Sequence, residues 1–267
     1  MDFPMPRNDA PRRGTKQQSR RADLAAGTTG EPEQTGSLRA RAISEIRSRI
    51  QTGVLAPDHT FSEVTICEEL GMSRAPVREA LIALSCGGWL EPLPRAGWQV
   101  RALTLNEARN LMAVRAALAP VAAAAAARRA PHEEEARAAL QAYCDIQESD
   151  EPVDEVIVAL YRCLRRIARL SGNLEFDRCL EDVLSRLVRY YLLTPVQEAL
   201  RSESIPIHPV VEAVLAGDSD AAHDQMLSFV TRDQRRLTEA IIDSDLVQSV
   251  KLTLPSGHTP TRRRDSA

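Results

Sequence analysis

The chain has 267 residues, 43% of them apolar, and a formal net charge of −3, so it holds enough apolar material for the cores of two ordinary domains. Its five cysteines are odd in number and no two have CxxC spacing, which argues against a disulfide framework and a zinc finger. No apolar run approaches the roughly 20 residues of a membrane-spanning helix and no secretion signal opens the chain, so we expect a cytoplasmic protein with no membrane partner.

The two ends of the chain differ in composition from its middle. Residues 1–36 are rich in proline, glycine, threonine, glutamine and arginine, and we expect them to be a disordered arm. Residues 243–267 are similar and are expected to be a disordered tail. Residues 37–101 hold 8 arginines and 7 acidic residues, whereas residues 103–242 hold 16 arginines and 22 acidic residues. The basic charge therefore lies toward the N-terminal side, where local placement of arginine matters more for DNA binding than total charge.

The first folded unit is predicted over residues 37–102 and opens with a helix that Gly53 ends. Isoleucines recur along this helix at helical spacing: Ile43, Ile46 and Ile50. Pro57-Asp58 then indicates a turn, and residues 59–61 are a candidate short strand.

Two serines are candidate caps for the next two helices. Ser62 can cap a helix over residues 64–70, and Ser73 can cap a third helix. Pro76 is tolerated in the first turn of that third helix, where the backbone needs no N–H donor. Paired glycines at positions 87 and 88 end it.

Two short strands complete the unit, over residues 89–91 and 98–100, with residues 92–97 as the loop between them. The order is helix, short strand, helix, helix, strand, loop, strand. This order predicts a winged helix-turn-helix with a small β-wing.

The third helix has one face for packing and another for reading DNA. Its apolar residues recur at i, i+3, i+4 and i+7: Val77, Ala80, Leu81 and Leu84. Arg74 and Arg78 lie four apart on another face, and arginine can donate two hydrogen bonds to O6 and N7 of guanine in the major groove. Ser73 and the first backbone N–H groups can meet a phosphate. Arg95 and Gly97 lie in the loop that would form the wing, where glycine permits close approach to the DNA backbone.

Residues 53–100 resemble the N-terminal domain of the GntR family of bacterial regulators. The resemblance rests on the Gly-x-Leu-x-Pro-x-x-x-Phe opening, the Ser-Arg-x-Pro-Val-Arg-Glu-Ala-Leu helix and the wing glycine. It implies a homodimer that binds an inverted-repeat operator on double-stranded DNA, most often as a repressor. The residues it implies at the DNA are Ser73, Arg74, Pro76, Arg78 and Gly97. Ala96 is a departure, because relatives often carry a basic or polar residue there.

Residues 103–242 are predicted to be entirely helical, in about seven segments. The breaks are predicted near Pro131, Glu151, Gly172, Thr194, Pro206 and Gly217. A helical unit behind such a head resembles the FCD domain of the FadR subfamily, and local matches occur at residues 103–127, 170–176 and 210–222. The resemblance implies an antiparallel all-α bundle that binds an effector and supports dimerisation.

Many FCD domains hold a metal ion, and the resemblance gives four ligand positions in this chain. They are occupied by Leu160, Leu164, Ile207 and Phe229. Apolar side chains cannot coordinate a metal, so we expect no metal and no cofactor. His208 and His223 lie near two of these positions. We interpret both as surface or loop histidines, with a shifted metal site as the less favoured alternative.

Arg115 lies on an apolar helical stripe, where its charge is costly unless it is paired. The stripe consists of Ala108, Leu111, Leu118 and Ala122. The resemblance implies that Arg115 binds an anionic effector, although the glutamate usual four residues later is Ala119 here. The alternatives are an internal ion pair, for example with Asp233, or an exit to solvent.

The chain lacks the GxSxG, HExxH and phosphate-loop motifs, so we predict no enzyme. The leading prediction is a sequence-specific DNA-binding repressor that a small anionic or lipophilic effector releases. The alternatives are an orphan regulator without an effector and a helical protein-interaction module.

Overall fold

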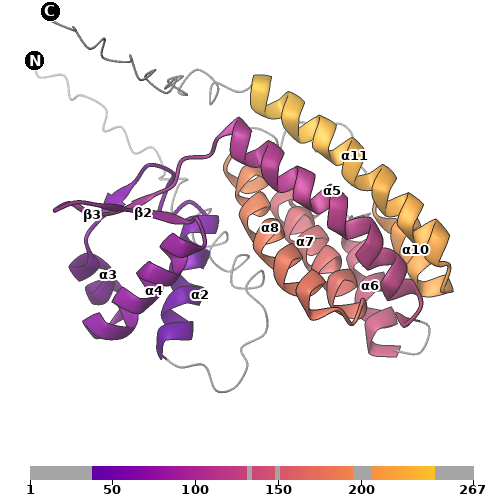
Figure 1. Cartoon of the computed structure of the whole chain (residues 1–267), viewed down its shortest axis with the longest axis horizontal. Coiled ribbons are helices and arrows are strands. Elements are labelled where there is room, and N and C mark those ends of the chain that lie inside the picture. Colours follow the sequence, from indigo (N-terminus) through magenta and orange to yellow (C-terminus); the bar gives the residue numbers. More distant parts are fainter. Residues whose placement is uncertain (1–37, 131–133, 148–150, 195–205, 244–267) are drawn as a thin grey trace, which may run out of the picture.

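The computed structural model consists of a small winged head beside a larger helical bundle (Figure 1). It describes residues 38–130, 134–147, 151–194 and 206–243. The predicted N-terminal arm, almost all of the predicted tail and the predicted helical segment between Thr194 and Pro206 lie outside the described residues.

The head has the predicted order of elements. Its elements are α2 (Leu38–Gln51), β1 (Thr60–Phe61), α3 (Glu63–Leu70), α4 (Arg74–Cys86), β2 (Leu90–Leu93) and β3 (Gly97–Val100). Ser62 caps α3 as expected, with its side chain accepting a hydrogen bond from the Thr65 N–H at 3.1 Å. The strands form an antiparallel sheet in the order β1-β3-β2. The prediction of a winged helix-turn-helix is confirmed.

The loop of the wing is shorter than predicted. Residues 92 and 93 were expected in the loop but belong to β2, where Pro92 pairs with Trp98 of β3. Because β2 is an edge strand of the sheet, a proline there can turn its missing N–H toward solvent without breaking the ladder. The turn is therefore reduced to residues 94–96.

Gly97 is held in place by the neighbouring strand β1. Its φ is +95°, and a Cβ atom built on it would lie 2.3 Å from the Phe61 carbonyl oxygen. The close approach that requires glycine is thus to the protein's own backbone. The sequence prediction explained this glycine by close approach to the DNA backbone. The contact with β1 is by itself a sufficient reason for a glycine at this position.

Backbone strain alone at such a position costs about 1–3 kcal/mol. We expect Gly97→Ala to destabilise the head by more than this, because the added Cβ also clashes with Phe61. The matched control is Gly71→Ala, where φ is +62° and no atom lies within 4 Å of the added Cβ. This variant should lose only the about 1–2 kcal/mol of stability that a left-handed backbone costs a residue with a side chain. Thermal unfolding followed by circular dichroism compares the two variants. Equal losses would contradict the packing role of Gly97.

The bundle is all-helical in the part of the chain that the structure describes. Its helices are α5 (Leu105–Ala127), α6 (Glu134–Gln147), α7 (Val153–Leu170), α8 (Leu174–Leu193), α10 (His208–Ala216) and α11 (Ser219–Asp243). Helix α5 packs on α11, α8, α7 and α10 and so forms the centre of the bundle. Thr104 caps α5 and Asn173 caps α8, each accepting hydrogen bonds from backbone N–H groups of the first turn.

Helix α5 is more apolar than the sequence interpretation allowed. Among the described helices it is the one long and apolar enough to cross a membrane by length and composition. Half of its most apolar window is buried inside the bundle, and the core helix of a globular protein passes the same test. Its composition is therefore explained by its central place in the bundle.

Candidate DNA interface and bundle interior

Helix α4 has the two faces that its sequence predicts. The four apolar residues of the packing face are all buried: Val77, Ala80, Leu81 and Leu84. On the other side, Ser73, Arg74 and Arg78 are exposed and Pro76 is half-buried in the first turn. Ser73 is the N-cap of α4, yet its side chain makes no capping hydrogen bond. Its hydroxyl is therefore available to a phosphate.

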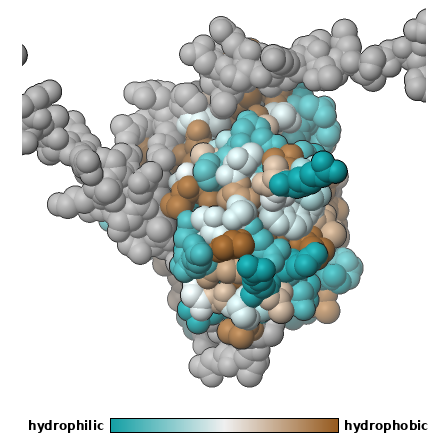
Figure 2. All heavy atoms as spheres, turned by 90° about the vertical axis from the view of Figure 1, so that its left-hand side faces the viewer, coloured by the Kyte–Doolittle hydropathy of each residue, from teal (hydrophilic) through white to brown (hydrophobic). Residues whose placement is uncertain are grey.

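The charges around α4 leave its two arginines available to DNA. On α4, Glu79 pairs with Arg39 at 3.9 Å, and neither Arg74 nor Arg78 forms an ion pair with the described residues. An arginine without a carboxylate partner gives up no ion pair when it binds a base edge or a phosphate. Seen from the side of the head, the surface mixes hydrophilic and scattered apolar side chains (Figure 2).

The wing places a third arginine at its tip. Arg95 is exposed and adopts a left-handed backbone conformation with φ of +64°. This conformation is uncommon for a residue with a side chain, and here it closes the short turn between β2 and β3. Arg95 is thus exposed at the turn of the wing, whereas Gly97 lies against β1.

In the bundle, Arg115 forms the internal ion pair that was one of its predicted alternatives. Its Nη2 atom lies 2.5 Å from Oδ2 of Asp233, and both side chains are buried. The Tyr191 hydroxyl donates to the same oxygen, also at 2.5 Å. Burial by itself would lower the pKa of Arg115, but attraction to Asp233 and Tyr191 outweighs it and raises that pKa. Arg115 is therefore charged at every pH at which the protein is folded.

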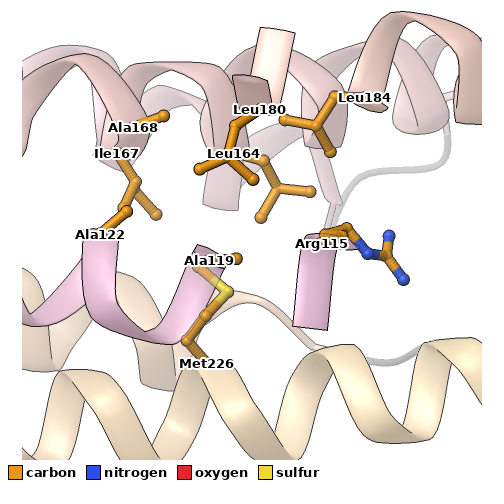
Figure 3. Close-up of a pocket in the computed structure, with 9 residues that line it drawn as sticks. All are labelled: Arg115, Ala119, Ala122, Leu164, Ile167, Ala168, Leu180, Leu184 and Met226. Carbon is orange, nitrogen blue, oxygen red and sulfur yellow. The ribbon is translucent and has the colours of Figure 1, made fainter. Parts of the chain in front are cut away.

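Arg115 also borders a very small cavity in the bundle. The cavity has a volume of about 10 Å³, the space of roughly one water molecule. Figure 3 shows its lining and the Arg115 guanidinium directed away from the apolar side chains. The lining residues are Arg115, Ala119, Ala122, Leu164, Ile167, Ala168, Leu180, Leu184 and Met226. All of them except Arg115 are apolar, so the cavity itself offers no second polar group to a ligand.

The four positions at which the resemblance implied metal ligands are packed into the bundle. Leu164, Ile207 and Phe229 are buried, and Leu160 packs partly buried against the same core. His208 opens α10, and His223 lies on α11 with its Nδ1 3.0 Å from Asp224. Across the described residues, no three His, Cys, Asp or Glu side chains gather where they could hold a metal ion.

The sequence interpretation missed one buried arginine, Arg189 of α8. It is 1% exposed, its guanidinium lies 5.6 Å from the centre of the Trp89 ring, and Nη2 donates to the Arg101 carbonyl at 2.9 Å. Burial lowers its pKa from the usual value. The signal in the sequence is an arginine inside the apolar run from Leu187 to Leu193, which is costly unless the charge is compensated.

Two family models match the chain. Residues 38–100 match the model for bacterial regulatory proteins of the gntR family, and residues 110–232 match the FCD domain. Together the two models account for most of the chain, and they correspond to the head and the bundle.

Two relatives with similar sequences carry names of transcription regulators. One is an HTH-type transcriptional regulator in the TAR-I ttuE-ttuC' intergenic region of Agrobacterium vitis, 37% identical over 31% of this chain and 48% of that protein, so the match spans about half of the relative. The other is a probable D-xylose utilization operon transcriptional repressor of Paenarthrobacter nicotinovorans, 27% identical over 72% of this chain and 87% of that protein.

Two solved structures share the fold. E. coli McbR/YncC has a TM-score of 0.67 and 20% identity over 77% of this chain and 99% of its own. A GntR protein from Rhodococcus sp. RHA1 has a TM-score of 0.63 and 22% identity over 77% of this chain and 99% of its own. At these identities the likeness concerns the fold alone.

Proposed function

We propose, because the chain belongs to the GntR family of bacterial regulatory proteins and carries an FCD domain, that it is a cytoplasmic repressor that binds an inverted-repeat operator as a homodimer. The family consists of transcription regulators and not of enzymes. The observation that carries the proposal is the exposed face of α4, on which Ser73, Arg74 and Arg78 have no competing ion pair among the described residues. Two copies of this helix, one from each protomer, would enter successive major grooves on one side of the duplex.

A mobility-shift assay on the DNA upstream of the protein's own gene tests the proposal. The retarded complex should persist with excess unrelated duplex and weaken as salt rises, because each neutralised phosphate releases counterions. A helical interaction module, the competing function, predicts no salt-sensitive specific shift on any upstream region.

For the bundle, we propose that Arg115 binds no external anion in the conformation described here. Two observations support this: Asp233 already neutralises Arg115, and the adjoining cavity has room for about one water molecule. They favour the orphan regulator over release by a small carboxylate. A larger lipophilic effector would have to displace the side chains that line the cavity.

Thermal shift with citrate and with Zn²⁺, Ni²⁺ and Mn²⁺, each added alone, is expected to leave the Tm unchanged. The physical reason is that a ligand raises the Tm only by binding the folded state, and the four metal-ligand positions of the family are apolar here. Stabilisation by citrate would reinstate Arg115 as an effector residue. Stabilisation by a metal would instead point to His208 and His223.

A further inference from the structure

Three consecutive residues of α8 contact three different parts of the molecule. Arg189 reaches the head, where it lies over Trp89 and donates to the Arg101 carbonyl. Tyr191 reaches the bundle interior, where its hydroxyl donates to Asp233. Both residues are buried, so each contact is shielded from water. One helix therefore holds, two residues apart, a contact to the head and a contact to the Arg115–Asp233 ion pair.

Tyr190, between them, contacts the connection from head to bundle. Its hydroxyl oxygen accepts from the Thr104 N–H at 3.1 Å and lies 3.0 Å from the Thr104 carbonyl and 2.8 Å from Oε2 of Glu107. Thr104 is the N-cap of α5. Tyr190 thus fixes the point at which the chain leaves the head and enters the bundle.

Helix α8 also lies along helix α2 of the head. The Gln51 side chain donates to the Ser185 carbonyl at 3.0 Å, and the Cβ position of Gly53 is 2.8 Å from a methyl carbon of Leu193. Figure 1 shows α8 on the side of the bundle nearest the head. Arg47 of α2 also pairs with Glu181 of α8 at 3.9 Å, so the head is seated on α8 from Glu181 to Leu193.

Helix geometry makes these contacts move together. Consecutive residues of an α-helix point about 100° apart, so Arg189, Tyr190 and Tyr191 leave α8 in three directions from one rigid turn. A rotation or shift of α8 that relaxes the Tyr191–Asp233 hydrogen bond displaces Arg189 from Trp89 at the same time. Arg189 is sensitive to such a shift, because its buried Nε has no hydrogen-bond partner and its charge is stabilised by groups outside α8: the Trp89 ring, the Arg101 carbonyl and Glu107.

We propose that α8 transmits the state of the Arg115–Asp233–Tyr191 cluster to the head through Arg189 and Trp89. Loss of the cluster's hydrogen bonds would loosen the seat of the head and change its orientation on the bundle. This regulation needs no particular effector, because any event that separates Asp233 from Tyr191 would change the contact between Arg189 and Trp89. The inference is independent of DNA binding, because both ends of the path lie within the chain.

Trp89 is a natural reporter for this path. The chain has two tryptophans, so Trp98→Phe leaves Trp89 as the single fluorophore. In that background, Tyr191→Phe and Asp233→Asn are expected to shift Trp89 emission to longer wavelength and to increase its quenching by acrylamide. Arg189→Ala should produce the same change directly. Arg178→Ala, on α8 but with a 78% exposed side chain, is the matched control and should change nothing.

The outcomes separate the proposal from its rivals. Unchanged Trp89 emission and quenching in a folded Tyr191→Phe variant, when Arg189→Ala does respond, would overturn it. If Asp233→Asn lowers the helical circular dichroism signal, the test depends on Tyr191→Phe alone. Tyr191→Phe removes one hydroxyl and no charge, so it disturbs the fold less. An unresponsive Arg189→Ala would also overturn the proposal, since the contact with Trp89 would then be absent. No DNA is present, so failure here is distinct from failure of the repressor assignment.

Discussion

Replacing Asp233 by alanine is expected to destabilise the protein by about 3–5 kcal/mol, because Arg115 would stay buried and charged without its carboxylate partner. Deprotonating Arg115 offers no escape, since an arginine side chain stays protonated in proteins. Thermal unfolding should show the loss as a fall in Tm of roughly 6–20 °C.

Two further variants identify the cause of that loss. Removing both charges with Arg115→Met and Asp233→Leu should recover most of the stability, since apolar replacements of a buried ion pair are often neutral or stabilising. Asp224→Ala, on the same helix with a 79% exposed side chain, should leave the Tm unchanged. A Tm of Asp233→Ala equal to that of Asp224→Ala would show that the buried pair is not formed.

Replacing Arg78 or Arg74 by alanine is expected to cost about 1–3 kcal/mol of operator affinity each, which is roughly a 5- to 150-fold rise in Kd. Both side chains are exposed and outside the packing face of α4, so the Tm should stay unchanged. Fluorescence anisotropy with the duplex retarded in the mobility-shift assay gives the Kd. Arg109→Ala, an exposed arginine of α5 remote from α4 in sequence, is the control and should leave the Kd as it is.

The comparison of specific and scrambled duplexes tells base reading from phosphate contact. A base-reading arginine loses affinity mainly for the specific duplex, whereas a phosphate contact weakens both and lowers the salt slope by about 1. We expect the first pattern for Arg78. Ser73→Ala should weaken both duplexes alike and leave the salt slope unchanged, because a hydroxyl carries no charge and releases no counterion. Unchanged affinity in all variants of α4 would exclude this face as the interface.

The head could be predicted closely from its sequence because its signals are local. Ser62 before α3, and the i, i+3, i+4, i+7 pattern from Val77 to Leu84, each depend on neighbours within one or two turns. The two short strands around the 92–97 loop indicated the wing, and the family resemblance agreed with it. The predicted end of this strand, at residue 91, was wrong by two residues, because β2 runs to Leu93. Proline is tolerated in a strand at the edge of a sheet, and the sequence alone did not show that β2 is an edge strand.

The bundle contacts join residues that are far apart in the chain, so the sequence could only reduce the number of candidate partners. The stripe on α5 indicated that Arg115 needs a partner, and Asp233 was one named alternative, 118 positions away. That Tyr191 joins the same oxygen follows only from the packing of α8 and α11 on the common helix α5. Arg189 was missed for the same reason: its compensation comes from the Trp89 ring and the Arg101 carbonyl, both in another part of the chain.

The role of Gly97 shows the limit of reading a motif residue by residue. The family pattern places a glycine at the wing, and a function at the DNA is the first interpretation of such a position. The structure supplies a sufficient reason within the protein, because any Cβ would overlap the Phe61 carbonyl. A motif can therefore contain residues that shape the site together with residues that contact its ligand.

Hydroxyl-radical footprinting of the intact protein on the upstream duplex that it retards tests the central claim most directly. A homodimer that reads DNA with two copies of α4 predicts two protected patches related by a dyad, with centres about one helical turn, or about 10 base pairs, apart. Uniform protection without a dyad, at protein concentrations that give a full mobility shift, would contradict sequence-specific recognition through α4.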